Sequence, residues 1–143
     1  MTTFVLDASV AAKWFLPPAA ENLSVAAHAL LERHEKGRAE FLVPDVFWAE
    51  AGNIFWKAVR TGRFSRANAE KSLMVLKSGR LTTISSITIL ETAFSIATGF
   101  GRSFYDSLYV ALAVESGVNL ITADEKLVNA LAGKFPVKLI GAI

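Results

Sequence analysis

Four acids stand in largely apolar stretches of this chain and are the residues best suited to chemistry. They are Asp7, Glu50, Asp106 and Asp124. Between Met1 and Ala12 no other charged side chain accompanies Asp7, and Asp106 is equally alone between Phe104 and Val114. A carboxylate that faces an apolar core is costly unless its charge is compensated. One hard divalent cation, which takes oxygen ligands, would compensate all four together.

Each acid also has a simpler interpretation. Asp7 follows a strand and precedes a helix, where aspartate caps helices. Asp106 fits a capping box that begins at Ser103, and Asp124 lies inside a second box formed by Thr122 and Glu125. Glu50 is too deep in its helix to cap it, so its alternative is a buried salt bridge. The simpler interpretations need four separate accounts, whereas one cation needs a single one.

Three polar residues stand beside these acids. Ser9 lies two positions after Asp7, Thr122 two positions before Asp124, and Asn53 one helical turn after Glu50. Partners of this kind orient metal-binding carboxylates or metal-bound water. Helix capping is the alternative for Ser9 and Thr122.

Apolar runs and breakers predict alternating strands and helices. The expected strands cover residues 3–6, 41–43, 81–84, 118–121 and 137–140. The expected helices cover residues 8–15, 21–36, 45–60, 65–77, 85–98, 103–116 and 124–131. The expected caps are Asp45, Ser65, Ser103 and either Ser85 or Ser86. This alternation predicts one α/β domain over residues 1–143, with a parallel sheet of about five strands in a three-layer α/β/α arrangement.

The predicted topology brings the acids together. Sheets of this kind bind ligands beyond the carboxyl ends of their strands. Asp7 lies just past the first strand and Asp124 just past the fourth, so they share one edge although they are far apart in the chain. Glu50 and Asp106 lie near helix N-termini, which tolerate negative charge.

Composition bounds the partners and the compartment. The chain has no cysteine, hence no disulfide framework and no thiolate metal site. It has no basic leader and no apolar run of the roughly 18–20 residues that span a bilayer, so we expect a cytoplasmic protein without membrane contact. A hydrophobic fraction of 52% suits either an aromatic core or an oligomer surface.

The charge balance points to a polyanion as partner. Fifteen basic residues face thirteen acidic ones, and the sequence pI is about 9.0. A cation at the four acids would leave a basic shell around an acidic centre, which suits nucleic acid. The candidates for phosphate contacts, each of which is otherwise a solvated surface residue, are Lys13, Lys57, Arg60, Arg63, Arg102 and Lys126.

Four segments resemble, in order and spacing, the successive motifs of PIN domains, and most closely those of VapC-type toxins from toxin–antitoxin pairs. They are Val5–Ser9, Pro44–Asn53, Tyr105–Ala113 and Leu120–Asp124. The resemblance implies that the four acids bind the metal of a Mg²⁺- or Mn²⁺-dependent endoribonuclease. It also implies the parallel α/β fold, a homodimer and inhibition by a cognate antitoxin.

The expected reaction is metal-assisted hydrolysis of an RNA phosphodiester. One cation would activate water for in-line attack, and a second could stabilise the leaving oxygen. The sequence leaves open whether one or two ions bind.

Two rival functions remain. A metal-dependent phosphatase or phosphotransferase of similar topology would want a second acid at Ser9, or an acid at Ser85 after the third strand. The chain also lacks a glycine-rich phosphate loop. The other rival is a catalytically inactive PIN-like binding domain, against which the presence of all four acids weighs.

Overall fold

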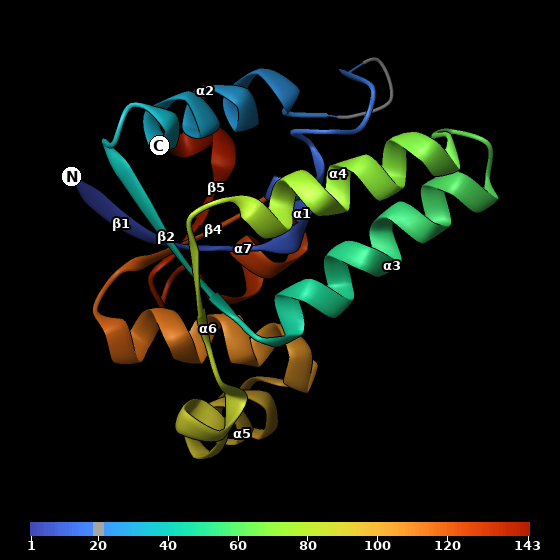
Figure 1. Cartoon of the computed structure of the whole chain (residues 1–143). Coiled ribbons are helices and arrows are strands. Elements are labelled where there is room, and N and C mark those ends of the chain that lie inside the picture. The colour runs from blue at the N-terminus through green and yellow to red at the C-terminus, as the bar shows by residue number, and fades with distance from the viewer. Residues whose placement is uncertain (19–21) are drawn as a thin grey trace.

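The computed structural model describes residues 1–18 and 22–143, which form a five-stranded parallel sheet covered by helices (Figure 1). The strand order is β3-β2-β1-β4-β5, and each neighbouring pair runs in parallel. The strands are β1 (Thr2–Leu6), β2 (Ala39–Pro44), β3 (Leu81–Ile84), β4 (Asn119–Thr122) and β5 (Val137–Leu139). The predicted α/β fold with about five parallel strands is confirmed.

Seven α-helices connect and cover the strands. They are α1 (Ala8–Ala12), α2 (Ser24–Glu35), α3 (Val46–Arg60), α4 (Arg66–Ser78), α5 (Leu90–Phe100), α6 (Phe104–Ser116) and α7 (Glu125–Leu131). The part of the chain that the structure describes also includes the 3₁₀ turns η2 (Ser86–Ile89) and η3 (Ile140–Ala142). Figure 1 shows α2 on one side of the sheet and α5 with α6 on the other, so the molecule has the predicted three layers.

The core lies where α6 crosses the sheet. Seven consecutive residues of α6, from Ser107 to Ala113, are buried, and the helix packs on β1, β2 and β4. Leu6 and Ile121 at the centre of the sheet have no exposed surface. A helix that is apolar on every side needs cover on every side, and α5 supplies it on the face away from the sheet.

The strand order creates a switch point between β1 and β4. From β1 the chain moves to β2 and β3 on one side, then returns to place β4 on the other. Crevices at such points, beyond the carboxyl ends of the strands, are the usual ligand sites of doubly wound sheets. Asp7 directly follows β1, and Asp124 stands two residues after the end of β4.

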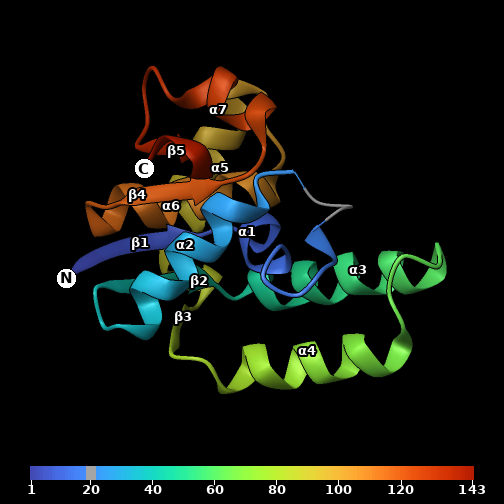
Figure 2. The same ribbon diagram turned by 90° about the horizontal axis from the view of Figure 1, so that it is seen from above.

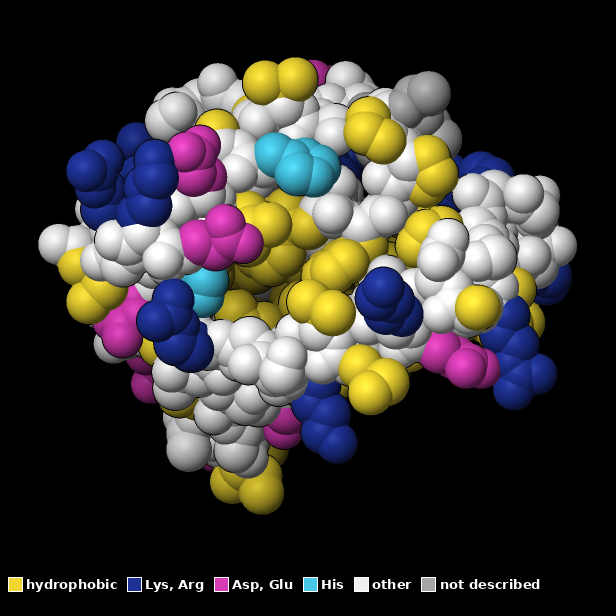
Figure 3. Space-filling view, turned by 45° about the horizontal axis from the view of Figure 1, so that its top comes forward, with side chains coloured by type: hydrophobic (Ala, Val, Ile, Leu, Met, Phe, Trp, Pro, Cys, Tyr) yellow, Lys and Arg dark blue, Asp and Glu magenta, His cyan; other side chains and the backbone are white. Residues whose placement is uncertain are grey.

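Helices α3 and α4 form an antiparallel hairpin that projects from the sheet (Figure 2). A second apolar cluster holds the hairpin, because Phe55 and Ala58 in the C-terminal half of α3 pack on Ala12 and Leu16 near α1. Between α2 and α4 lies an apolar groove of about 350 Å³, whose floor includes Trp14, seen as the yellow hollow in Figure 3. Within the described residues no helix combines the length and the apolar character needed to cross a membrane.

Some predicted boundaries are wrong for local reasons. The first helix ends at Ala12, because the next residues form tighter turns, with the amides of Trp14 and Phe15 bonded to carbonyls three residues back. The second helix begins at Ser24, and its predicted start at Glu21 lies outside the described residues. Of the two candidate caps before α5, Ser85 is the one whose hydroxyl accepts an amide hydrogen bond, and it caps η2 instead.

Candidate metal and phosphodiester site

The four predicted acids line one open pocket of about 500 Å³ at the switch point. Asp7 comes from the β1–α1 junction, Glu50 from α3, Asp106 from α6 and Asp124 from the β4–α7 junction. Each is partly exposed. The rest of the wall consists of Ala8, Ser9, Val46, Ala49, Asn53, Ile54 and Tyr105. The structure therefore gathers at one pocket four acids that are widely separated in the chain.

Asp7 caps α1 and faces the pocket at the same time. Its Oδ1 accepts from the Ser9 amide at 3.4 Å, while its Oδ2 accepts from the Ser9 hydroxyl at 3.0 Å and the Thr122 hydroxyl at 2.6 Å. Burial raises the pKa of Asp7, these hydrogen bonds oppose the rise, and the charge of Asp106 adds to it. Asp7 is thus a fixed carboxylate whose charge is incompletely compensated.

Thr122 and Ser9 join the two strands beneath the pocket. The fully buried Thr122 hydroxyl donates to Asp7 and accepts from the Asp124 amide at 3.1 Å. The Ser9 hydroxyl accepts from the Ala123 amide at 3.2 Å. Both hydroxyls contact the Asp7 carboxylate directly, as the supporting role predicted for Ser9 and Thr122 requires.

Asp124 caps α7 with its own side chain. Its Oδ1 accepts from the amides of Lys126 at 3.0 Å and Leu127 at 3.3 Å. The capping box expected from Thr122 and Glu125 is therefore wrong, because Asp124 occupies the cap and Thr122 turns toward Asp7. Asp124 still lines the pocket with its carboxylate.

Glu50 is held by a tyrosine rather than by the salt bridge considered above. The hydroxyl of Tyr109, a residue only 2% exposed, donates to Glu50 Oε1 at 2.6 Å. Burial raises the pKa of Glu50; the hydrogen bond opposes this, and the charges of Asp7 and Asp106 reinforce it. Sequence reasoning missed Tyr109, although a tyrosine one turn after Asp106 in an apolar helix was the available signal.

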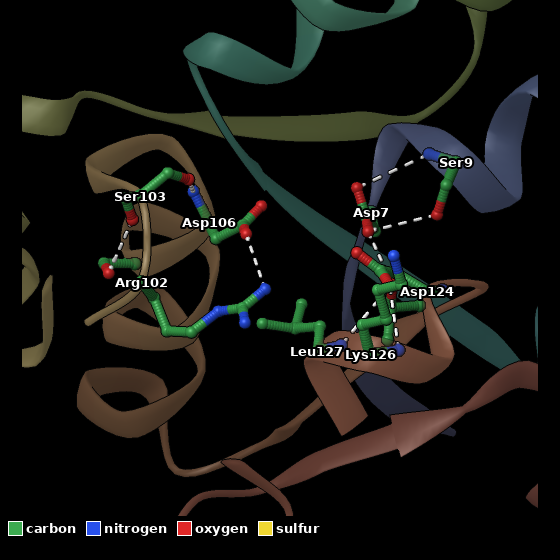
Figure 4. A network of polar contacts seen from close by, with 10 residues as sticks. Asp7, Ser9, Arg102, Ser103, Asp106, Asp124, Lys126 and Leu127 are labelled. Carbon is green, nitrogen blue, oxygen red and sulfur yellow. Dashed lines mark hydrogen bonds and ion pairs between the residues drawn. The ribbon is translucent and has the colours of Figure 1, made fainter. Parts of the chain in front are cut away.

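Asp106 faces an arginine. The Ser103 hydroxyl accepts from the Asp106 amide at 3.1 Å, as the predicted cap requires. The Asp106 carboxylate does not complete a reciprocal box; its Oδ2 lies 3.4 Å from a guanidinium nitrogen of Arg102. Figure 4 shows this pair on one side of the pocket and Asp7, Ser9 and Asp124 on the other. Among the described residues, Asp106 is the one acid of the four with an ion-pair partner.

The pocket suits a hydrated divalent cation in donor type and charge. Mg²⁺ prefers oxygen ligands, keeps several waters and needs only one or two carboxylates. Burial, reinforced by the charges of the neighbouring acids, raises the pKa values of Asp7 and Glu50, so a cation placed beside them would favour their charged forms. Within the described residues no three acidic or histidine side chains converge closely enough to hold an ion. Asp106 and Asp124 are at the same time engaged with other donors.

Several predicted phosphate contacts lie outside the pocket. Lys57 and Arg60 continue the face of α3 that carries Glu50 and Asn53, and Arg60 stacks on Trp56 at 4.8 Å from the ring centre. Lys13 is buried and Arg102 pairs with Asp106. Asp45, which we expected to cap α3, instead accepts hydrogen bonds from the amide and hydroxyl of Ser86.

The fold and the acidic pocket define a doubly wound α/β domain with an anionic centre at its switch point. A sequence model of the PIN domain matches residues 4–132, and the chain belongs to the PIN-domain family.

Its relatives carry VapC names. Exonuclease VapC9 of Pyrobaculum aerophilum is 29% identical over 131 residues, which cover 88% of this chain and 92% of that protein. Ribonuclease VapC3 of the same organism is 34% identical over 134 residues, covering 92% of this chain and 94% of that protein.

Solved structures share the fold. The crystal structure of PAE2754 from Pyrobaculum aerophilum matches 99% of this chain and 92% of its own, with a TM-score of 0.70 and 25% identity. A toxin–antitoxin complex from Klebsiella pneumoniae matches 96% of this chain and 97% of its own, with a TM-score of 0.66 and 17% identity.

Proposed function

We propose that the protein is a divalent-metal-dependent endoribonuclease that hydrolyses RNA phosphodiesters as the toxin of a toxin–antitoxin pair. The observation that carries this is the single pocket lined by all four acids, two of which have raised pKa values. Membership of the PIN-domain family and the ribonuclease name of a relative support it.

Asp7, Glu50 and Asp106 would hold Mg²⁺ or Mn²⁺, with Asp124 completing the site. A bound ion of this kind supplies an activated water and neutralises charge on the phosphoryl oxygens. The protein's own part is to fix the ligands. Ser9 and Thr122 hold the Asp7 carboxylate, and Tyr109 holds that of Glu50.

Positively charged side chains that would bind the phosphate backbone of RNA lie beside the pocket. Lys57 and Arg60 lie about two to three turns from Glu50 on the same face of α3, so a strand bound in the pocket would run along this helix. Exposed Trp56, stacked under Arg60, offers a ring face for a base.

The test is cleavage of a labelled RNA with Mn²⁺, with excess chelator, and with the Asp7→Asn variant. We expect cleavage only by the wild type with metal. Asp45→Asn is the matched control, because Asp45 follows β2 at the same edge of the sheet but lies outside the pocket. Cleavage that survives chelation or Asp7→Asn would refute the proposal.

The names of the two relatives differ between exonuclease and ribonuclease, so the substrates must separate these activities. A circular RNA has no ends and is cut only by an endonuclease. A phosphate monoester tests the rival phosphatase, and a matched DNA tests sugar specificity. If every substrate survives while Mn²⁺ still raises the melting temperature, the inactive binding domain is favoured.

We also propose a cytoplasmic homodimer bound by a cognate antitoxin. A row of exposed apolar residues on η2 and α5, comprising Ile87, Leu90 and Phe94, supports a self-association surface. Phe94→Glu should halve the mass measured by light scattering. Met74→Glu, which is equally exposed on α4, should leave it unchanged. Growth arrest on expression, relieved by a small protein encoded next to the gene, tests the antitoxin.

A further inference from the structure

Arg102 is a charged side chain whose hydrogen bonding is incomplete. It lies in the short link between α5 and α6, after Gly101 in the left-handed conformation (φ +65°) and before the helix cap Ser103. Its Nε is buried and has no hydrogen-bond partner in the described structure. Buried hydrogen-bond donors normally have a partner, so the guanidinium of Arg102 retains one unused donor, its Nε.

The contact that Arg102 does make is with a carboxylate of the pocket. The guanidinium nitrogen lies 3.4 Å from Asp106 Oδ2, and the two side chains are 24% and 31% exposed. This is longer than the ~2.7–2.9 Å of a strong charge-assisted hydrogen bond. The surface pair Arg66–Glu70 on α4, which has the same spacing of four residues, closes to 2.7 Å.

We propose that Arg102 is a positioning residue that acts as an internal counter-cation: its guanidinium neutralises Asp106 in the metal-free protein and must leave Asp106 Oδ2 when a divalent ion binds. This rests on the metal site proposed above. It gives the one acid of the four that has an ion-pair partner among the described residues a role for that partner. A single long contact can be broken at low cost, whereas a short bidentate one would block the site.

The charge of Arg102 changes the affinity for metal in one definite direction. A fixed positive charge next to the ion, together with a contact that must be broken, weakens metal binding. Removing the charge therefore tightens it. Without metal, the same removal leaves Asp106 uncompensated beside Asp7 and Glu50, whose pKa values already reflect its charge. Arg102 thus lets the acidic pocket fold without an ion, at the expense of affinity for one.

The experiment is titration of the purified protein with MnCl₂ by calorimetry, together with thermal melting in EDTA. Arg102→Met should lower the Kd for Mn²⁺ about tenfold, between the small effect of an exposed ion pair and the large effect of a buried one. It should also lower the melting temperature in EDTA. Arg66→Met, which breaks an exposed pair with the same spacing and removes the same charge, should change neither.

Weaker Mn²⁺ binding by Arg102→Met would overturn the proposal and make Arg102 an aid to metal binding. An affinity equal to that of Arg66→Met would overturn it as well. If Arg102→Met does not fold, Arg102→Gln provides the neutral variant, and the same outcomes apply. Failure of the wild type to bind Mn²⁺ would sink the proposed metal site together with this inference, whereas wild-type binding with an unchanged variant sinks only the latter.

Discussion

The hydrogen bond from Tyr109 to Glu50 gives the sharpest test of how the pocket holds its charge. Tyr109→Phe removes one buried hydroxyl and keeps the ring, so packing is preserved. Burial, the charge of Asp7, and the hydrogen bond and charge of Glu50 all raise the pKa of Tyr109, so its hydroxyl stays a donor at every working pH. The variant therefore removes the hydroxyl that donates a hydrogen bond to the half-buried Glu50 carboxylate.

The expected loss follows from the type of bond. Hydrogen bonds to charged groups contribute about 1.5–3 kcal/mol, and Glu50 is partly exposed, so water recovers some of this. We expect about 1.5–2 kcal/mol at pH 7.5 in EDTA, or a melting temperature lower by about 5 °C. The loss should shrink toward pH 5 as Glu50 takes up a proton, because its folded-state pKa is raised and the bond to a neutral acid is weaker.

Urea unfolding of four proteins measures this as a double-mutant cycle. The proteins are the wild type, Tyr109→Phe, Glu50→Gln and the double variant, and Tyr105→Phe serves as the exposed control from the same helix. In the Glu50→Gln background the hydroxyl meets a neutral acceptor, so its removal should cost about 1 kcal/mol less. An equal loss in both backgrounds and at both pH values would refute the reasoning and reduce the hydroxyl to a packing group.

Three further predictions concern the neighbouring ligands. Glu50 has a folded-state pKa above its unfolded value, so the stability linked to its proton is present at low pH and is lost as the pH rises through the folded pKa. Glu50→Gln in EDTA should therefore flatten the dependence of stability on pH as the pH rises from the ordinary glutamate value of 4.5. Asp124→Ala should lower the free energy of unfolding by about 1 kcal/mol through loss of the α7 cap, as chemical unfolding would show. Asp124→Asn should keep the cap and weaken only Mn²⁺ binding, as calorimetry would show. Equal behaviour of the two variants would contradict separate roles of Asp124 in capping and in metal binding. Thr122→Val should cost about 1–2 kcal/mol in urea unfolding, because Asp7 loses a donor and the Asp124 amide an acceptor, and an unchanged midpoint would contradict this.

The sequence predicted the architecture because its signals are local. Apolar runs such as Val118–Ile121 lie between breakers, and the caps Ser65 and Ser103 stand where α4 and α6 begin. The topology then placed the acids, since parallel strands deliver their carboxyl ends to one edge. The shared edge of Asp7 and Asp124 could therefore be expected without knowledge of any side-chain contact.

The partners of those acids were beyond the sequence because they depend on packing between helices. Tyr109 reaches Glu50 only after α6 and α3 lie against the same sheet, and the pairing is 59 residues apart in the chain. Arg102 was expected to contact phosphate and contacts Asp106. Asp45 was expected to cap its own helix and binds Ser86, because β3 ends next to it. Each difference is a choice among nearby donors that only three-dimensional geometry settles.

The order in which the strands lie side by side also decides when the pocket can first exist. Its floor joins Asp7, directly after β1, to Thr122, the last residue of β4, and to Asp124 two residues beyond it. A chain in which β4 has not yet paired with β1 therefore has no such floor. Any local opening between these two strands would also dismantle the pocket, even where every helix around it stayed folded.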